Sequence, residues 1–185
     1  YLENDFSSAI FLMLIFMIMF FAAGGPLLWF LKGLIVTIPC AALMVVTSTY
    51  RMKRVLSFIS PDSDPLDTGY QINAALEALA SSGLYGTGIG NGVHKISSVP
   101  EIYSDFIFVA WAEEMGFLGV CGYLALLLTF TAVAYLIAFS CKDRFGCYVA
   151  FGAASAIILQ SFLNLGVVVR LLPATGIPLP FFSFG

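Results

Sequence analysis

Charged residues are scarce in this sequence. Only 10% of its 185 residues are Asp, Glu, Lys or Arg, whereas 60% are hydrophobic, and the mean hydropathy is +0.97. Because soluble domains carry about 25% charged residues, this composition excludes an ordinary soluble domain and predicts an all-α integral membrane protein. The chain also lacks a dense basic stripe, so we expect no nucleic-acid partner.

Cysteine and histidine are also few. None of the four cysteines forms a CxxC pair. Cys40 and Cys121 lie in apolar runs, where Cys behaves as a small hydrophobe, and Cys141 and Cys147 have neither zinc-site spacing nor a His partner. We therefore expect no disulfide and no zinc site. The chain starts at Tyr1 without a basic, cleavable leader, so we expect no signal peptide and a piece of a longer protein.

Long apolar runs, in contrast, are plentiful. We predict four membrane spans, at about residues 6–24, 33–49, 105–140 and 145–171. The first two should form an antiparallel hairpin, because the connection Gly24–Lys32 is short. A helix over 105–140 would be about 54 Å long, well above a ~30 Å hydrocarbon core. Its lipid-embedded part should therefore begin near Phe117, with the earlier turns in water or in a protein-lined cavity.

Residues 50–104 form one long loop between spans. We expect an amphipathic helix over Arg51–Ile59, lying in the membrane interface, and a second helix over Tyr70–Ser82 that stops at Gly83. The stretch Gly83–Gly92 is rich in glycine but matches neither GxGxxG nor a phosphate-binding P-loop. We interpret it as a flexible loop held close to a ligand or to neighbouring backbone.

The stretch Lys95–Gly116 places several charged groups beside an apolar run. Charge at such a place is costly unless it is paired or functional. Asp105 is the strongest functional candidate, although an Asp there could simply cap the following helix. Glu101 also has two interpretations, because Ser98 and Glu101 have the spacing of a capping box.

Polar residues also occur within and after the last apolar run. Gln160 and Asn164 lie one turn apart on one helical face, which is typical of polar side chains packed between helices. The chain ends in a Pro- and Gly-rich, re-entrant-looking stretch, Pro173–Gly185. With four spans, the N-terminal acids, the long loop and this stretch lie on the same membrane face, which is the geometry of a site.

Four sequence motifs resemble one known family. They occur in the order seen in the shape, elongation, division and sporulation (SEDS) family of FtsW, RodA and SpoVE: GYQ (69–71), GLYGTGIGNGVHK (83–95), PEIYSDFIFVAWAEEMGFLG (100–119) and PATGIPLPFFSFG (173–185). The likeness covers essentially the whole chain. By resemblance, the chain would supply the sixth to ninth helices of a ten-helix bundle, without the last helix, and 50–104 would be an extracellular loop carrying short interfacial helices.

The resemblance implies a function. Family members act in the bacterial inner (cytoplasmic) membrane as inverting peptidoglycan glycosyltransferases that polymerise lipid II into glycan strands. The 4-hydroxyl of one lipid-linked GlcNAc would attack C1 of the other sugar chain, and undecaprenyl diphosphate would leave. A class B penicillin-binding protein and other divisome or elongasome membrane proteins would be partners. Whether division, elongation or sporulation is served stays open.

The resemblance also implies roles for two aspartates. Asp105 aligns with the essential aspartate of the family's extracellular loop and would be the general base, with a divalent cation (Mg²⁺ or Mn²⁺) held on the diphosphate as its alternative role. Helix geometry puts Glu114 on the opposite face, about 13 Å away along the axis, so the two carboxylates should not form a pair. Asp5 aligns with the aspartate of the QPDLGTA motif, which here is ENDFSSA.

Several other residues complete the predicted site. We predict substrate binding for Asp5, Arg51, Lys53, Lys95, Glu101 and Ser183. The three basic residues would contact the diphosphate, although basic residues beside a membrane also meet anionic lipid. We predict structural or supporting roles for Glu114, Gln160, Asn164, Pro173 and Gly176.

Two other functions stay open at this point. The protein could be a flippase for lipid-linked precursors, or a scaffold that recruits a penicillin-binding protein. A flippase should line a path through the bilayer, whereas the strong charges here gather on one face. Arg51, Lys53 and Arg54 directly follow the second span, and positive charge there favours the cytoplasm. The extracellular placement of 50–104 therefore comes from the resemblance alone.

Overall fold

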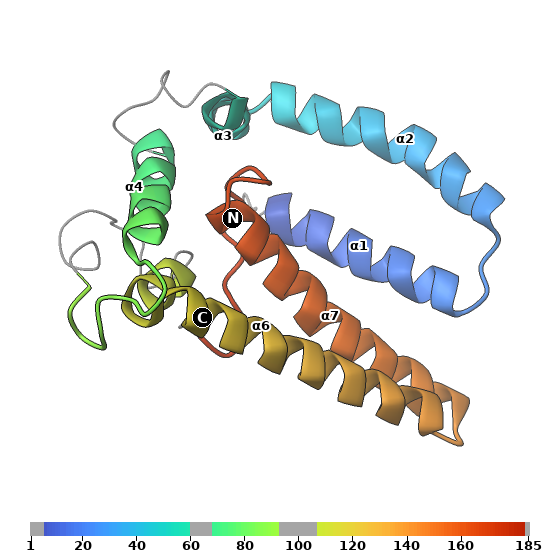
Figure 1. The fold of residues 1–185 in the computed structure, drawn as a ribbon. Coiled ribbons are helices and arrows are strands. Elements are labelled where there is room, and N and C mark those ends of the chain that lie inside the picture. The colour runs from blue at the N-terminus through green and yellow to red at the C-terminus, as the bar shows by residue number, and fades with distance from the viewer. Residues whose placement is uncertain (1–5, 60–67, 93–106, 184–185) are drawn as a thin grey trace.

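The computed structural model describes residues 6–59, 68–92 and 107–183; residues 1–5, 60–67, 93–106 and 184–185 lie outside this description. Within the described ranges every regular element is an α-helix (Figure 1): α1 (Phe6–Ala22), α2 (Leu27–Val46), α3 (Thr49–Ile59), α4 (Thr68–Ser81), α6 (Ile107–Ser140) and α7 (Arg144–Val168). The predicted all-α class is confirmed for this part of the chain.

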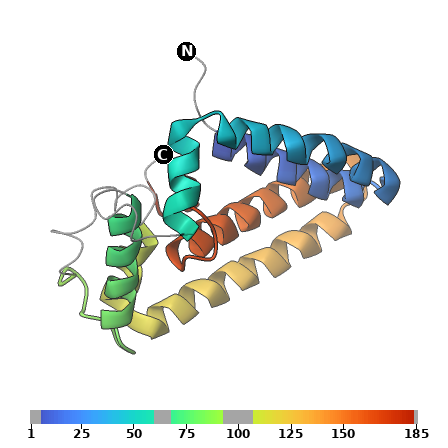
Figure 2. The same ribbon diagram turned by 90° about the horizontal axis from the view of Figure 1, so that it is seen from above.

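The helices form an open bundle capped at one end. α6 and α7 run antiparallel on either side of the turn Cys141–Asp143 and make the largest helix contact. α1 packs against α7, and α4 packs against the first part of α6 (Figure 2). α3 contacts both α2 and α4, so the two short helices expected within the long loop cover the same end of the bundle.

Three of the helices are long and apolar enough to cross a membrane, namely α2, α6 and α7. α1 is also apolar but has 17 residues, at the lower limit of about 17–25 for a span. Large apolar side chains on these helices are exposed, including Leu12 (65%) and Leu126 (70%), as expected of surfaces that face lipid. The protein is a multi-pass helical membrane protein, and the count of four spans stays a prediction.

The helix of the second predicted span begins earlier than the predicted span. α2 begins at Leu27, not Gly33, because Pro26 stands in extended conformation at the N-cap and the residues after it continue the apolar run. Lys32 fits within the helix because its Nζ lies 5.0 Å from the centre of the Trp29 ring. α1 and α2 run antiparallel from a shorter turn than expected (Figure 1).

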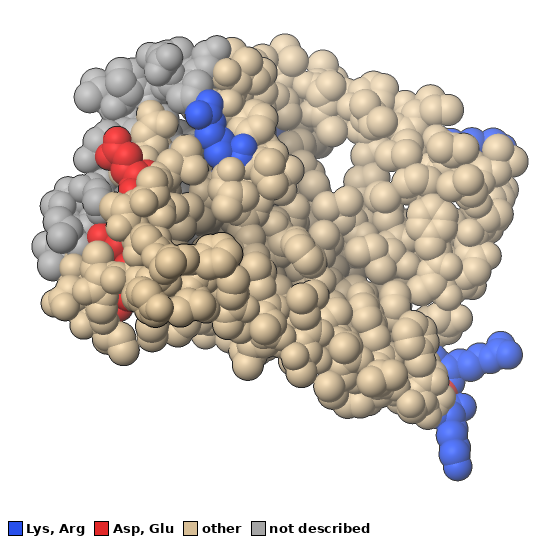
Figure 3. Space-filling view, in the orientation of Figure 1, with Lys and Arg blue, Asp and Glu red and all other residues tan. Residues whose placement is uncertain are grey.

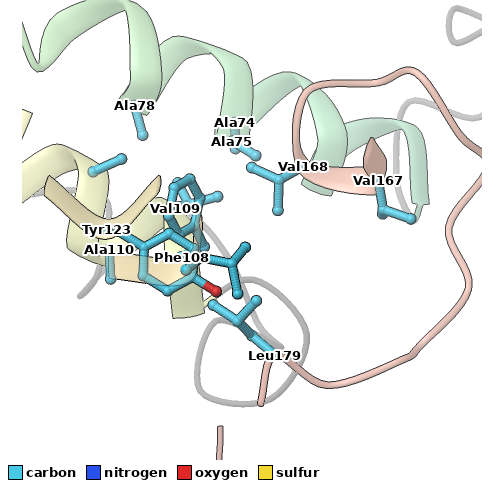
Figure 4. Packing of buried hydrophobic residues seen from close by; sticks show 12 residues of the cluster. Ala74, Ala75, Ala78, Phe108, Val109, Ala110, Tyr123, Val167, Val168 and Leu179 are labelled. Atoms are coloured by element: carbon cyan, nitrogen blue, oxygen red, sulfur yellow. The ribbon is translucent and has the colours of Figure 1, made fainter. Parts of the chain in front are cut away.

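The buried core lies where α4 crosses α6. Small side chains on α4 (Ala74, Ala75 and Ala78) let the two helices approach closely. Larger side chains from the first turns of α6, the end of α7 and the C-terminal segment pack against them (Figure 4): Phe108, Val109, Val168 and Leu179. Segments far apart in sequence are therefore fixed relative to one another at this end.

Among the described residues, charge is confined to the two ends of the bundle. Lys and Arg side chains gather over α3 at one end and beside the α6–α7 turn at the other, with an apolar surface between them (Figure 3). No Asp, Glu, Lys or Arg occurs within residues 6–22, 33–46, 117–140 or 145–168. This distribution fits a bilayer spanned by the middle of the bundle.

Candidate functional site

The candidate site is the end of the bundle that carries α3 and α4, called here the polar end. The start of α1, the end of α7 and residues 173–183 also lie there (Figures 1 and 2). The helices of the long loop and the C-terminal segment, two of the three segments predicted to converge, thus lie at the same end, whereas the N-terminal acids fall outside the described residues. Asp5, Lys95, Glu101 and Asp105 fall outside the described residues, so their roles stay predictions.

A break in α6 organises the polar end. Gly116 has φ +67° and ψ −166°, which divides α6 into a short buried part and a longer part that begins at Phe117, where we expected the lipid span to begin. A break leaves amides and carbonyls of the two halves without helical partners. The glycine-rich loop supplies them: Phe117 N donates to Gly83 O (3.0 Å), Leu118 N to Leu84 O (3.2 Å), Thr87 N to Glu113 O (3.0 Å) and Gly88 N to Glu114 O (3.0 Å).

Glycine is required where the loop and the break touch. Gly86 and Gly116 both have positive φ, and a Cβ on Gly116 would overlap the backbone of Gly86, Leu84 and Tyr85. A Cβ on Gly86 would overlap the backbone of Glu114. The glycine-rich stretch therefore serves close approach to neighbouring backbone, the second of the two possibilities that its sequence left open.

The adjacent acids Glu113 and Glu114 have different environments. Glu113 is 1% exposed, and a Cβ added to Gly92 would lie 3.0 Å from its Oε2. Glu114 is half-buried. Sequence reasoning did not separate the two, although Val109, Ala112, Glu113 and Gly116 have the i, i+3, i+4, i+7 spacing of one helical face. Glu113 thus lies beside Gly92. In the sequence, Gly92 directly precedes the segment that contains Lys95, Glu101 and Asp105.

Gln160 and Asn164 hold the C-terminal segment. Gln160 Nε2 donates to Pro178 O and Asn164 Nδ2 to Ile177 O, both at 2.9 Å. Their supporting role was predicted, but we expected a contact between helices, and these two bonds go instead to an extended segment. A proline-rich segment cannot form a helix, so its carbonyls have no helical partners. They accept hydrogen bonds from side chains instead.

The other C-terminal candidates shape this segment. Gly176 has φ +70°, and Pro173 stands at its start, half-buried. Ser183 is half-buried, and its amide and hydroxyl both bond to Leu179 O, at 3.1 Å and 3.3 Å. These contacts are structural, and the substrate contact of Ser183 stays a prediction.

The basic residues of α3 point in different directions. Arg51 donates to Met44 O at 3.0 Å, with its guanidinium 5.0 Å from the centre of the Phe6 ring. Arg54 donates to Ala174 O at 3.2 Å. Lys53, in contrast, is exposed. At 100° per residue, positions 51 and 54 share a face that position 53 does not, so Arg54, absent from our predicted set, is turned inward and Lys53 outward.

The described residues contain no group of three or more His, Cys, Asp or Glu side chains that could hold a metal ion. Asp105, to which we assigned a possible Mg²⁺ or Mn²⁺, is not among those residues. The cation therefore stays a prediction.

Known proteins resemble this chain in sequence. The model of the FtsW/RodA/SpoVE family, described as "Cell cycle protein", matches residues 1–185. A Borreliella burgdorferi protein named "Probable peptidoglycan glycosyltransferase FtsW" is 40% identical over 184 residues, covering 100% of this chain and 50% of that protein. A Geobacter sp. (strain M18) protein of the same name is 37% identical over 183 residues, covering 99% and 50%.

A solved structure also resembles this chain. One chain of "Structural coordination of polymerization and crosslinking by a peptidoglycan synthase complex" matches with a TM-score of 0.72 and 29% identity, over 100% of this chain and 51% of that chain. The present chain spans about half the length of the curated relatives it matches. With the family model matching from the first residue to the last, the chain belongs to the FtsW/RodA/SpoVE family.

Proposed function

We propose that the protein is a peptidoglycan glycosyltransferase that polymerises lipid II in the bacterial inner membrane. The observation that carries this proposal is the likeness to proteins named as such, at 37–40% identity along the chain. The described structure supports it, because charged and polar side chains gather at the polar end, and the sugar and diphosphate of a lipid-linked substrate stand at a membrane surface.

In the proposed reaction, Asp105 accepts the proton of the attacking 4-hydroxyl while undecaprenyl diphosphate leaves. Asp105 lies two residues before the start of α6 in sequence, and Lys95 lies ten residues before Asp105. The alternative role of Asp105 is to hold a divalent cation on the diphosphate.

We further propose that the polar end faces the outside of the cytoplasmic membrane and that a class B penicillin-binding protein and other divisome or elongasome proteins are partners. The structural neighbour comes from a peptidoglycan synthase complex, which supports such an assembly. The outward orientation follows from the substrate, because glycan strands are assembled outside the membrane.

The test measures lipid II polymerisation by the complete protein with its penicillin-binding partner, before and after Asp105→Asn. Loss of a general base should lower the rate by about 10²- to 10⁴-fold. Asp143→Asn is the matched control, because Asp143 caps α7 at the opposite end through Gly146 N (2.9 Å), and Asn caps helices equally well. Equal rates for wild type and Asp105→Asn would remove Asp105 from the chemistry.

Two further arms separate the alternatives. Titration with Mg²⁺ and Mn²⁺ distinguishes the roles, since a cation holder should show metal-dependent activity that Asp105→Asn abolishes. Labelled lipid II that crosses vesicle membranes without forming polymer would support the flippase instead. The uncharged middle of the described helices argues against a charged path through the bilayer.

A further inference from the structure

A cavity at the end of the bundle opposite the polar end is not used by the proposed chemistry. It lies between the end of α1, the end of α6 and the first two turns of α7. Its volume is about 660 Å³, within the range of roughly 300–1,000 Å³ that is typical of small-molecule sites. We call it the turn cavity, because it adjoins the turn Cys141–Asp143.

The lining of the turn cavity changes from charged to apolar with depth. Arg144, Tyr148 and Phe151 line it from α7, and their i, i+4, i+7 spacing places them on one helical face. At 1.5 Å per residue, Phe151 lies about 10 Å from Arg144 along the helix axis. Phe139 lines the cavity from α6, and its ring centre is 6.1 Å from that of Phe151. A guanidinium is thus followed by a phenol and then by an aromatic wall, Phe139 and Phe151.

The helix α1 closes the deep side of the turn cavity. Met19 lies so near α7 that a Cβ added to Gly152 would be 2.9 Å from its sulfur. Ala22, nearly one turn further along α1, lines the cavity with only a methyl group. Space remains between the helices because this small side chain stands opposite the first turns of α7.

The cavity has a positively charged mouth. Arg144 makes no ion pair and no side-chain hydrogen bond within the part of the chain that the structure describes. The acid beside it, Asp143, does not line the cavity, and its carboxylate accepts a hydrogen bond from Gly146 N at 2.9 Å. Lys142 adds a second positive charge to the turn, and basic side chains extend from the bundle there (Figure 3). The mouth therefore favours an anion.

The position of the cavity indicates what the anion is attached to. The uncharged stretches 117–140 and 145–168 end and begin beside the turn, so the mouth lies at a membrane surface and the aromatic wall lies deeper. Basic pockets between membrane helices bind the head groups of anionic phospholipids. We propose that the turn cavity binds an anionic phospholipid, with its phosphate at Arg144, its glycerol beside Tyr148 and an acyl chain along the aromatic wall.

This inference goes beyond the proposed function, because the site lies at the other end of the bundle and its test needs no polymerisation. The complete protein, delipidated in detergent, would be titrated with phosphatidylglycerol, phosphatidylcholine, diacylglycerol and inorganic phosphate, and bound ligand would be followed by native mass spectrometry. We expect retention of phosphatidylglycerol alone. Equal retention of phosphatidylcholine would overturn recognition of an anionic lipid, and equally tight inorganic phosphate would overturn the lipid itself.

Two charge variants separate the cavity from general attraction to the surface. Arg144→Gln should weaken phosphatidylglycerol binding roughly 10-fold, because a hydrogen bond between two charged groups is lost. Lys142→Gln removes the same charge from an exposed residue that does not line the cavity, so the affinity should stay nearly unchanged. Equal losses in both variants would attribute binding to surface electrostatics and overturn the cavity as the site.

Two uncharged variants test the cavity itself. Ala22→Trp should abolish binding, because an indole at this position fills space that the lipid needs. Ala23→Trp is the matched control, since Ala23 is also exposed at the end of α1 but does not line the cavity. Thermal unfolding would confirm that both variants are folded. Unchanged phosphatidylglycerol binding in folded Ala22→Trp protein would overturn the proposal.

Discussion

At the scale of residues, the contact between Gly86 and Gly116 fixes the polar end. Each backbone occupies the space that a side chain on the other would need. Gly116 also has a combination of φ and ψ that side-chain-bearing residues rarely adopt. The two glycines are therefore required by sterics and backbone conformation together.

Gly116→Ala should destabilise the protein by about 1–3 kcal/mol or more, because both the backbone conformation and the contact become strained. Gly122→Ala in the same helix is the control. No atom lies within 4 Å of the Cβ it would add, and alanine favours a helix by up to about 1 kcal/mol. Thermal unfolding in detergent would compare them, and equal midpoints for the two variants would contradict the steric requirement.

At the scale of elements, α6 is two helices joined through another part of the chain. The loop that follows α4 accepts hydrogen bonds from the start of the membrane part and donates to the end of the buried part. A helix start normally leaves its first amides to water. Here carbonyls of the loop accept these hydrogen bonds in place of water. The loop therefore connects the core beneath α4 to the start of the longer, apolar part of α6.

Amide hydrogen exchange should report this connection. We expect slow exchange at Thr87, Gly88, Phe117 and Leu118, whose amides donate across the break, and fast exchange at exposed Ile89, which donates none of the described bonds. Gly116→Ala should accelerate all four slow amides together. Fast exchange at Phe117 and Leu118 in the unmodified protein would show that the loop does not hold the break.

At the scale of the whole molecule, charge at both ends leaves the orientation in the membrane undetermined. The arginines and lysine of α3 stand at the polar end, and Lys142 and Arg144 stand beside the opposite turn. The tendency of positive residues to face the cytoplasm therefore does not favour the outward orientation that the proposed substrate requires.

Cysteine labelling would decide the orientation. With the native cysteines replaced by alanine, Lys53→Cys and Lys142→Cys each place one thiol at an exposed position, at opposite ends of the bundle. On intact spheroplasts, a membrane-impermeant maleimide should label Lys53→Cys and leave Lys142→Cys unlabelled until the cells are lysed. The reverse pattern would place the polar end in the cytoplasm and contradict an extracellular polymerase.

Local sequence patterns determined most of the elements. Apolar runs of membrane length predicted the long helices, and helical spacing ending at Gly83 predicted α4. The length of the third run also predicted that its first turns lie outside the lipid. The break at Gly116 separates these turns from the longer part of α6. These features depend on residues within a few turns of one another, which is why the sequence alone was sufficient.

The tertiary structure decided which side chains meet. Helical spacing places Glu113 on the same face as Val109 and Ala112, but the packing of that face beside the glycine-rich loop appears only in the tertiary structure. The acceptors of Gln160 and Asn164 lie on the proline-rich segment, and Arg54 joins Thr175 in a cavity only because α3 and that segment meet at the polar end. Hydrogen-bond partners depend on segments distant in sequence, and local periodicity carries no information about them.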